Sequence, residues 1–473
     1  MRVLLTASEA VPYAKTGGLA DVAGALLREL RALGVDARLF MPLYGCISAE
    51  VQDTGKSIPV QVGKEQQEGR LYTEGPYVFI RCDKYFARRE LYGTPEGDYP
   101  DNAHRFVFLS RAVLEAAKAL QFRPHIVHAN DWQTALVPFY LKTLYRGDAF
   151  FKDVKTLFTI HNLGYQGLFP RQMMLLTGLG WEYFNPEALE FYGRVNFLKA
   201  GILGADMVST VSPSYAREIL TPEYGFGLEG LLQKRAERLR GILNGLDTGT
   251  WNPLHDEHLP SPYGVRSLAG KGRAKALLVK RCGFSQARAP LLAMVGRLSA
   301  QKGVDLLLEV APWLISQGAN LVVLGKGDGT YQEALAALAS RSNGKLYLRL
   351  ELDEAFAHLV YAGADMFLMP SRYEPCGLGQ MIAQLYGTPP VARSTGGIAD
   401  TVEDYVPLRQ RGTGFLFKMP LAECLKEAIR SALCLWPIRD KWQRLQRAGM
   451  QKDFSWRRSA RQYLSLYKEL LGK

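Results

Sequence analysis

The chain has 473 residues, of which 47% are hydrophobic and 22% are charged. This length exceeds what one hydrophobic core normally supports, so we expect two globular domains. The sequence contains no uncharged apolar run of membrane-spanning length, and the residues after Met1 do not form a signal peptide. The composition therefore excludes an integral membrane protein, and we expect an unexported, cytoplasmic protein.

The charge balance is basic, because 58 Lys and Arg against 46 Asp and Glu give a net charge of +12. Such a charge attracts anions, and its sign alone does not choose among a nucleotide, a nucleic acid and a membrane surface. The basic residues are dispersed, so we expect a solvated surface with no nucleic-acid or membrane partner. The cysteines are spaced singly, which is typical of a reducing compartment and not of a zinc site or a disulfide scaffold.

Short apolar runs alternate with amphipathic stretches along the first half of the chain. The runs predict strands and the stretches predict helices, a pattern typical of parallel strands joined by crossover helices. The three predicted strand and helix pairs are Val3–Leu5 with Asp21–Leu33, Ile126–Ala129 with Thr134–Leu144, and Met207–Val211 with Pro213–Leu220.

The alternation restarts after residues 251–284, a stretch rich in Gly, Pro, His and charge. We therefore predict an α/β protein with two Rossmann-like doubly wound domains, residues 1–245 and 246–455. Residues 456–473 predict an amphipathic helix that could pack on either domain, including back on the first. The predicted strands of the second domain are Leu291–Val295, Leu321–Leu324, Met366–Met369 and Pro390–Ala392.

In open parallel sheets, ligands bind beyond the carboxyl ends of the strands. The first such loop, Lys15-Thr-Gly-Gly-Leu-Ala-Asp-Val22, leads into a helix that we expect to begin near Asp21. Gly17 and Gly18 let backbone N–H groups approach an anion, and Lys15 and the helix start add positive charge. The motif predicts a phosphate cradle, and the alternative is a tight turn that needs glycine only for its dihedral angles. Its spacing differs from those of P-loop kinases and dinucleotide dehydrogenases.

Two cations follow the first predicted strand of the second domain. In Val295-Gly-Arg297-Leu-Ser-Ala-Gln-Lys302-Gly-Val-Asp305, they lie five residues apart where a strand gives way to a helix. Arginine offers phosphate a planar fork and lysine a compact charge, so the pair can neutralise a departing diphosphate. Their place at a strand end, beside glycines, favours phosphate binding over a solvated surface.

A carboxylate follows another strand, in Pro370-Ser-Arg-Tyr-Glu374-Pro-Cys376-Gly-Leu-Gly-Gln380. At this position Glu374 can accept hydrogen bonds from sugar hydroxyls, and the alternative is that it satisfies the start of a helix. Glycine loops at residues 324–328 and 393–397 also follow predicted strands.

Polar side chains follow two strands of the first domain, in the motifs around His128 and His161. Asn162, Tyr165 and the neighbouring glutamine would give His161 a polar, aromatic lining suited to a sugar. A metal site built from these histidines is disfavoured, because their spacing is not the i, i+4 spacing of a helical ligand pair. Asn244-Gly-Leu-Asp247 lies at the proposed boundary and could be only a turn.

Taken together, these motifs resemble the bacterial glycogen synthases and plant starch synthases. Those enzymes are retaining glycosyltransferases with two facing Rossmann-like domains and an active-site cleft between them, an arrangement called GT-B. The matching motifs occur in family order between residues 15 and 397. Besides those already quoted, they are Leu91-Tyr-Gly, Asp98-Tyr-Pro-Asp-Asn102, Thr210-Val-Ser-Pro213, Trp251-Asn-Pro253 and Ser394-Thr-Gly-Gly397.

The resemblance implies transfer of glucose from ADP-glucose to the non-reducing end of an α-1,4-glucan such as glycogen, with retention of configuration and without a metal or pyridoxal cofactor. The catalytic residues that it implies are Asp131, His161, Arg297, Lys302 and Glu374. The implied donor-binding residues are Lys15, Gly17, Gly18, Asn244, Cys376, Gly377, Leu378, Gly396 and Gly397. The implied acceptor-binding residues are Tyr92, Asn162 and Tyr165.

One departure from the family pattern bears on the donor. Bacterial members commonly carry an aromatic residue that stacks on adenine just before a Glu-Ala-Phe motif, and this chain has Leu352 there. The donor base therefore stays open between adenine and uracil. The alternatives to a glucan synthase are a related sugar-nucleotide enzyme such as a sucrose-type synthase or an epimerase, a pyridoxal-dependent phosphorylase, and a catalytically silent glucan-binding homologue.

Overall fold

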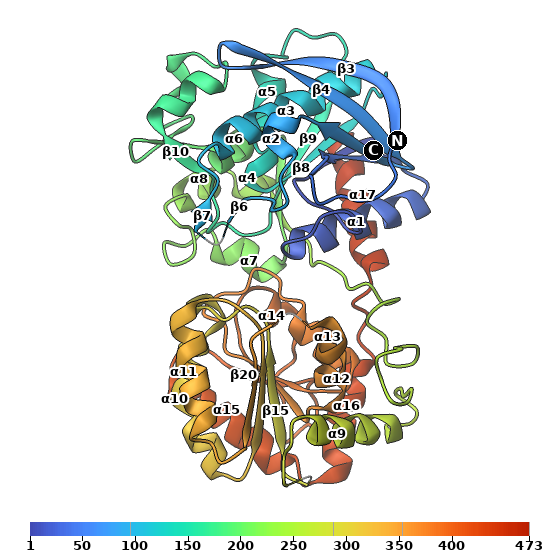
Figure 1. Ribbon diagram of the computed structural model, residues 1–473, viewed down its shortest axis with the longest axis vertical. Coiled ribbons are helices and arrows are strands. Elements are labelled where there is room, and N and C mark those ends of the chain that lie inside the picture. The colour runs from blue at the N-terminus through green and yellow to red at the C-terminus, as the bar shows by residue number, and fades with distance from the viewer. Residues whose placement is uncertain (95, 287, 352, 473) are drawn as a thin grey trace. The chain divides into compact units, whose positions relative to one another are not determined.

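A computed structural model describes residues 1–94, 96–286, 288–351 and 353–472. The chain divides into two compact units (Figure 1). Unit 1 comprises Met1–Val211, Ala216–Gly245 and Trp456–Lys473, and unit 2 comprises Ser212–Tyr215 and Leu246–Ser455. Each unit is built around its own sheet.

The sheet of unit 1 has nine strands, and its central strands are parallel and buried on both faces. Their near-continuous apolar sequences are typical of strands covered by helices on both sides. Antiparallel pairing occurs within the outer hairpin of residues 52–74 and between the second strand of this hairpin and the next strand of the sheet. In spatial order the strands are β14 (Leu239–Gly241), β13 (Met207–Thr210), β9 (Lys155–Ile160), β8 (Ile126–Asn130), β1 (Arg2–Thr6), β2 (Asp36–Pro42), β5 (Tyr77–Arg81), β4 (Glu65–Glu74) and β3 (Gln52–Val62).

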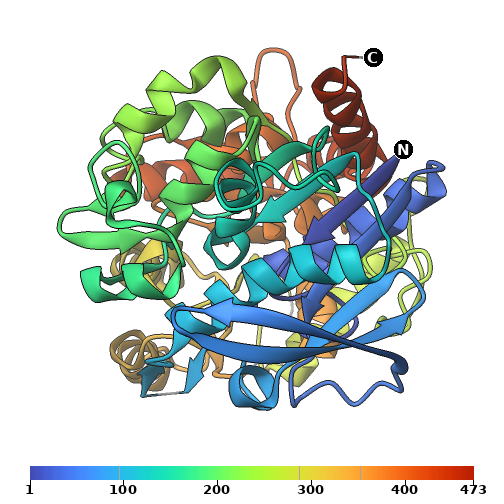
Figure 2. The ribbon, with the colours of Figure 1, turned by 90° about the horizontal axis from the view of Figure 1, so that it is seen from above.

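Helices cover the sheet of unit 1, and the C-terminal end of the chain lies in one of them. The last helix, α17 (Trp456–Leu470), packs on α1 (Gly18–Ala32), and Figures 1 and 2 show the two side by side. Tyr467 fixes α17 to the sheet, because its hydroxyl lies 2.8 Å from Nδ1 of the buried His128. The other helices include α2 (Asp83–Phe86), α3 (Asn102–Ala119), α4 (Asp131–Thr134), α5 (Leu136–Lys142), α6 (Phe197–Gly204) and α8 (Glu229–Lys234). Helix α7 (Pro213–Glu218) is divided between the two units, since Ser212–Tyr215 belongs to unit 2 and Ala216–Gly245 to unit 1.

A small antiparallel sheet projects from unit 1 between β9 and α6. It is formed by β10 (Leu168–Pro170), β12 (Arg194–Asn196) and β11 (Glu190–Phe191), in that spatial order. We call residues 168–196 the arm. It lies at the periphery of unit 1, around the label β10 in Figure 1 and among the green segments of Figure 2.

Unit 2 contains a six-stranded parallel sheet with helices on both faces. Its spatial order is β17 (Leu346–Arg349), β16 (Asn320–Leu324), β15 (Leu291–Val295), β18 (Met366–Met369), β19 (Pro390–Arg393) and β20 (Phe415–Phe417). The helices are α9 (Ala269–Arg281), α10 (Val304–Ser316), α11 (Gly329–Ser340), α12 (Glu354–Gly363), α13 (Gly379–Leu385), α14 (Gly396–Thr401), α15 (Ala422–Leu435) and α16 (Arg439–Met450). The doubly wound α/β class predicted from the alternation is confirmed.

Two local predictions were wrong in detail. The single helix expected at Thr134–Leu144 is two short helices, α4 and α5, with Ala135 between them. Residues 251–284, predicted as a break between the domains, contain helix α9. The sequence analysis missed this helix because of its glycines and lysines. Within α9 the Lys271 ammonium is buried and donates to the carbonyls of Ala362 and Ala364 and to the Thr388 hydroxyl. No helix among the described residues is long and apolar enough to cross a membrane.

Candidate active site

The carboxyl ends of β1, β8 and β9 meet at one edge of the unit 1 sheet, because the three strands are adjacent and parallel. The loops that leave this edge carry the predicted first-domain residues: Lys15, Gly17 and Gly18 after β1, Asp131 after β8, and His161, Asn162 and Tyr165 after β9. The fold therefore brings these three loops together, as the site prediction requires.

Neither the backbone conformation nor the packing around Gly17 and Gly18 requires glycine at these two positions. Gly17 has an extended backbone (φ −152°), and a Cβ on Gly18 would meet nothing within 4 Å. The turn alternative, in which glycine is needed only for its dihedral angles, is thus disfavoured. Helix α1 begins at Gly18 rather than near Asp21, so the pair lies at the helix start, and Lys15 bonds Asp21 at 2.8 Å. Open space beside a helix N-terminus suits an anionic ligand.

Glu9 accepts hydrogen bonds from this loop, and the sequence analysis missed this residue. One carboxylate oxygen accepts from the Thr16 backbone N–H at 2.5 Å and from its hydroxyl at 2.9 Å. Burial raises the pKa of Glu9, and the hydrogen bonds from Thr16 and Gly17 oppose that shift. A lone carboxylate within the otherwise apolar run after β1 was the signal that could have identified it.

Buried polar atoms lie close to this edge. The Tyr92 and Ser8 hydroxyls are 2.6 Å apart, and burial, followed by the Glu9 charge, raises the pKa of Tyr92 well above its usual value. The Oδ1 atom of buried Asn244 has no hydrogen-bond partner within the described parts of the chain. A buried acceptor without a partner is costly in a folded protein, so Asn244 is suited to receive a donor from a ligand.

Asp131 has a strained backbone with φ at +54°. Its carboxylate accepts the His161 backbone N–H at 2.7 Å, and the Asn162 backbone N–H also bonds to it. Asp131 therefore fixes the start of the loop that follows β9. Burial raises the pKa of Asp131 to about 7, although both backbone hydrogen bonds favour its charged form.

The His161 ring is held in a neutral state. Burial lowers its pKa to about 3, and Nε2 lies 3.0 Å from Oδ1 of Asn130, an amide oxygen that can only accept. Nε2 therefore carries the proton. The ring nitrogens of His128 contact the hydroxyls of Tyr467 and Thr159, and Nδ1 of His125 accepts the Arg2 backbone N–H.

The pH dependence of kcat/KM should report Asp131. The ionised carboxylate accepts both loop N–H groups more strongly than the protonated acid does, so we expect kcat/KM to rise with pH around 7. The free energy of unfolding should change with pH in the opposite direction. The raised pKa of Asp131 stabilises the fold below about pH 4, and this stabilisation is lost as the pH rises through 7.

Asp131→Asn tests this assignment, because asparagine tolerates a left-handed backbone but does not titrate. We expect both the rise in kcat/KM and the matching slope of unfolding free energy to disappear in the variant. Initial rates and thermal unfolding across about pH 5.5 to 8.5 check it. A variant that keeps the wild-type rise would assign the titration to another group.

At the carboxyl edge of the unit 2 sheet, a cation forms an ion pair with a carboxylate. Lys302 follows β15 and Glu374 follows β18, and their charged atoms lie 2.5 Å apart. The Ser371 hydroxyl donates to the same Glu374 oxygen at 3.0 Å, and Glu374 is only 5% exposed. Arg297 is exposed on the loop that also carries Lys302. The structure therefore assembles these residues from motifs 72 positions apart.

Close backbone packing shapes the loops around Glu374. Gly396 has φ +45°, and a Cβ there would lie 1.9 Å from the Glu374 carbonyl oxygen. A Cβ on Gly397 would lie 2.1 Å from the Cys376 carbonyl oxygen. Gly377 also has a positive φ, and α13 begins directly after Leu378. These glycines allow the loops after β18 and β19 to touch, which fixes the place of Glu374.

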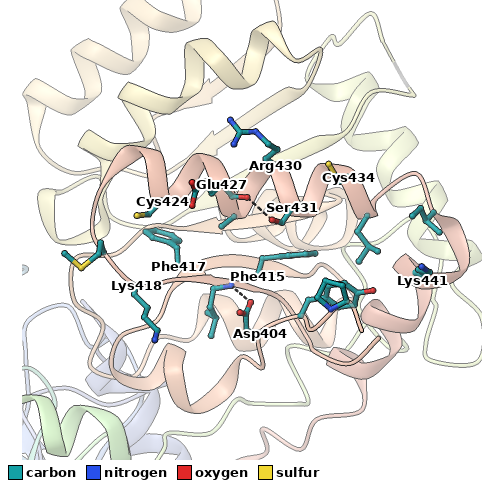
Figure 3. A pocket seen from close by; sticks show the side chains of 17 residues that line it. Asp404, Phe415, Phe417, Lys418, Cys424, Glu427, Arg430, Ser431, Cys434 and Lys441 are labelled. Carbon is teal, nitrogen blue, oxygen red and sulfur yellow. Dashed lines mark hydrogen bonds between the residues drawn. The ribbon is translucent and has the colours of Figure 1, made fainter. Parts of the chain in front are cut away.

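Unit 2 also contains a cavity of about 790 Å³ between β20 and α15, shown in Figure 3. Phe415 and Phe417 line it from β20, and Cys424, Ser431 and Cys434 line it from α15. None of the predicted site residues is among its lining residues.

Family models match both parts of the chain. The starch synthase catalytic domain model matches residues 2–234, and the glycosyl transferases group 1 model matches residues 283–448. A sucrose-phosphate synthase from Thermosynechococcus elongatus shares the fold, with a TM-score of 0.63 at 20% identity over 100% of this chain and 99% of that one. The protein is a glycosyltransferase with the GT-B fold.

Nearer relatives define the family. The glycogen synthase of Syntrophotalea carbinolica is 47% identical over 99% of both chains, and that of Thermodesulfovibrio yellowstonii is 43% identical over 100% of this chain and 98% of its own. The catalytic domain of starch synthase IV from Arabidopsis thaliana, solved with ADP and acarbose, matches with a TM-score of 0.90 and 33% identity over 100% and 99%. The chain belongs to the glycogen and starch synthase family, which confirms the resemblance found in its sequence.

Proposed function

We propose that the enzyme transfers glucose from ADP-glucose to the non-reducing end of an α-1,4-glucan, with retention of configuration. The observation that carries this proposal is the Lys302–Glu374 pair at the carboxyl edge of the unit 2 sheet. It places a cation suited to phosphate beside a carboxylate suited to sugar hydroxyls. The similar starch synthase solved with ADP and acarbose supports the choice of donor and acceptor.

The predicted residues have the following roles in this proposal, in which Asp131 positions the loop that carries His161. Arg297 and Lys302 hold the diphosphate, together with Lys15 and the open backbone at Gly17 and Gly18. Glu374 and His161 bind the transferred glucose. The remaining donor contacts come from Asn244, Cys376, Gly377, Leu378, Gly396 and Gly397, and the acceptor contacts from Tyr92, Asn162 and Tyr165.

The chemistry follows from where charge develops. Breaking the anomeric C–O bond builds positive charge on the sugar and negative charge on the leaving diphosphate, and Arg297 and Lys302 stabilise the latter. His161 is neutral, so its ring or its backbone carbonyl favours the positive sugar without repelling it. We propose a front-face transfer in which the leaving phosphate takes the acceptor proton.

The donor base decides between the main proposal and its nearest alternative, a related enzyme that uses UDP-glucose. Leu352, at the position where relatives carry an aromatic residue, lies outside the described residues. Initial rates with ADP-glucose and UDP-glucose at equal concentration, with glycogen as acceptor, test the choice. Faster transfer from ADP-glucose supports the proposal. Donor binding without transfer from either nucleotide would instead identify a silent glucan-binding homologue.

We further propose that the reaction needs neither a metal ion nor another cofactor. Within the described residues, no group of three or more His, Cys, Asp or Glu side chains could hold a metal ion. Activity should therefore persist in excess EDTA. Loss of activity in EDTA, with recovery on addition of one divalent ion, would contradict this proposal. The single spacing of the cysteines in the sequence supports a reducing, cytoplasmic setting for the reaction.

A further inference from the structure

Two surface turns of unit 1 have the same unusual composition. Tyr192 and Gly193 form the two-residue loop between β11 and β12, with φ of +47° and +76°. Phe226 and Gly227 form the centre of a second turn, with φ of +50° and +81°, closed by the Leu228 N–H to Gly225 carbonyl hydrogen bond of 2.8 Å. In both turns an aromatic residue occupies a left-handed position.

Such turns normally carry Asn-Gly, because a left-handed backbone is costly for residues other than Gly, Asn and Asp. An aromatic residue there strains the backbone without improving the turn. The rings are also exposed, since Tyr192 is 82% and Phe226 is 39% accessible to solvent. Backbone geometry does not account for the choice of aromatic residues at these two positions, and their exposure points to a role for their ring faces at the surface.

The two turns lie against each other. A Cβ on Gly227 would meet Cζ of Phe191 at 2.8 Å and Cε2 of Tyr192 at 3.4 Å, so the second turn touches the tip of the arm. Phe191 and Tyr192 contact edge to face, with ring centroids 4.7 Å apart. We call Phe191, Tyr192 and Phe226 the aromatic surface.

The aromatic surface is tied to the loop of His161. Nε2 of the Gln166 side chain donates to the Phe226 carbonyl at 3.0 Å, and its Oε1 accepts from Nδ2 of Asn196 at 2.7 Å. Gln166 is buried and follows Tyr165, which is itself exposed and was predicted to bind the acceptor. Gln166 thus links the loop that carries the predicted acceptor residues to the turn of Phe226 and, through Asn196, to strand β12 of the arm.

We propose that the aromatic surface is an accessory binding site for the α-1,4-glucan acceptor, in which Tyr192 and Phe226 stack on glucose units away from the reaction centre. The C–H faces of a pyranose ring are apolar, so they can stack on an exposed aromatic ring while the sugar hydroxyls stay in water. This site would add a second acceptor contact to the proposed function, and the identification of its ligand as an α-1,4-glucan rests on that function. It would let a long acceptor bind more tightly than a short one.

The test uses Tyr192→Asn, Phe226→Asn and the double variant, since asparagine suits both turns. Binding is measured without catalysis, by retardation in native gels that contain glycogen. Activity assays give the ratio of KM for glycogen to KM for maltotriose. We expect the double variant to bind glycogen roughly tenfold more weakly, with a Tm no lower than wild type and a raised KM of glycogen relative to maltotriose.

Gln121→Asn is the matched control, because Gln121 also has a left-handed backbone (φ +54°) in unit 1 but carries no ring. It should bind glycogen like the wild type. Unchanged glycogen binding in the double variant would overturn the proposal. So would a lower Tm with equal losses on both acceptors, or dissociation of a dimer in sedimentation, which would assign the rings to structure or to self-association. Failure of the wild type to transfer glucose to any α-1,4-glucan would instead refute the proposed function.

Discussion

Lys302→Ala is expected to lower kcat by roughly 10²–10³. The ammonium follows β15 and bonds the almost fully buried Glu374 at 2.5 Å. In the proposed mechanism this charge stabilises the leaving diphosphate more in the transition state than in the ground state. The loss should therefore appear in kcat, with a smaller change in the KM for the donor. Steady-state kinetics over a range of ADP-glucose concentrations measure both.

Removing Lys302 also leaves the Glu374 carboxylate without its cation, which by itself can disturb the loop. The double variant Lys302→Ala with Glu374→Gln removes both charges and separates the two effects. Lys345→Ala is a control at the opposite edge of the sheet, because Lys345 precedes β17. Arg297→Ala should behave like Lys302→Ala. Near-normal turnover in both single variants would reject the diphosphate assignment.

Much of the fold could be predicted because the central strands are short, apolar and buried on both faces. The strands at Val3–Leu5 and Met366–Met369 are examples whose composition leaves little choice. The outer strand β3 was not predicted, since most of its side chains are exposed and polar. Helix α9 was hidden for a related reason: its buried Lys271 looks like a surface charge until its three acceptors are seen.

The prediction of the site from the sequence was limited in the same way. A glycine beside a cation at a strand end can be found in the sequence, and this identified Lys15 and Lys302. The partner of a charge cannot be found in this way, because Lys302 and Glu374 are 72 residues apart. Glu9 beneath the glycine loop and the strained backbone of Asp131 likewise depend on contacts between different loops. Pairing across strands is long-range information that local patterns do not contain.

The stability of the protein should respond differently to substitution of glycines in the two units. Gly396→Ala forces a left-handed backbone on alanine and places its Cβ 1.9 Å from the Glu374 carbonyl oxygen. We expect it to lower the unfolding free energy by roughly 2–4 kcal/mol and to abolish most activity, since the loop that positions Glu374 must move. Denaturant unfolding and initial rates measure the two effects.

Gly18→Val is the matched change in unit 1, where a Cβ would meet no atom within 4 Å. Because the space beside Gly18 is open, the variant should unfold close to the wild type, apart from the small helix-propensity difference of valine. Its activity should nevertheless fall, and the KM for ADP-glucose should rise, because the added methyl groups occupy the space proposed for the diphosphate. A Gly18→Val enzyme with wild-type kinetics would show that this space is not used, and the phosphate role of the loop after β1 would have to be abandoned.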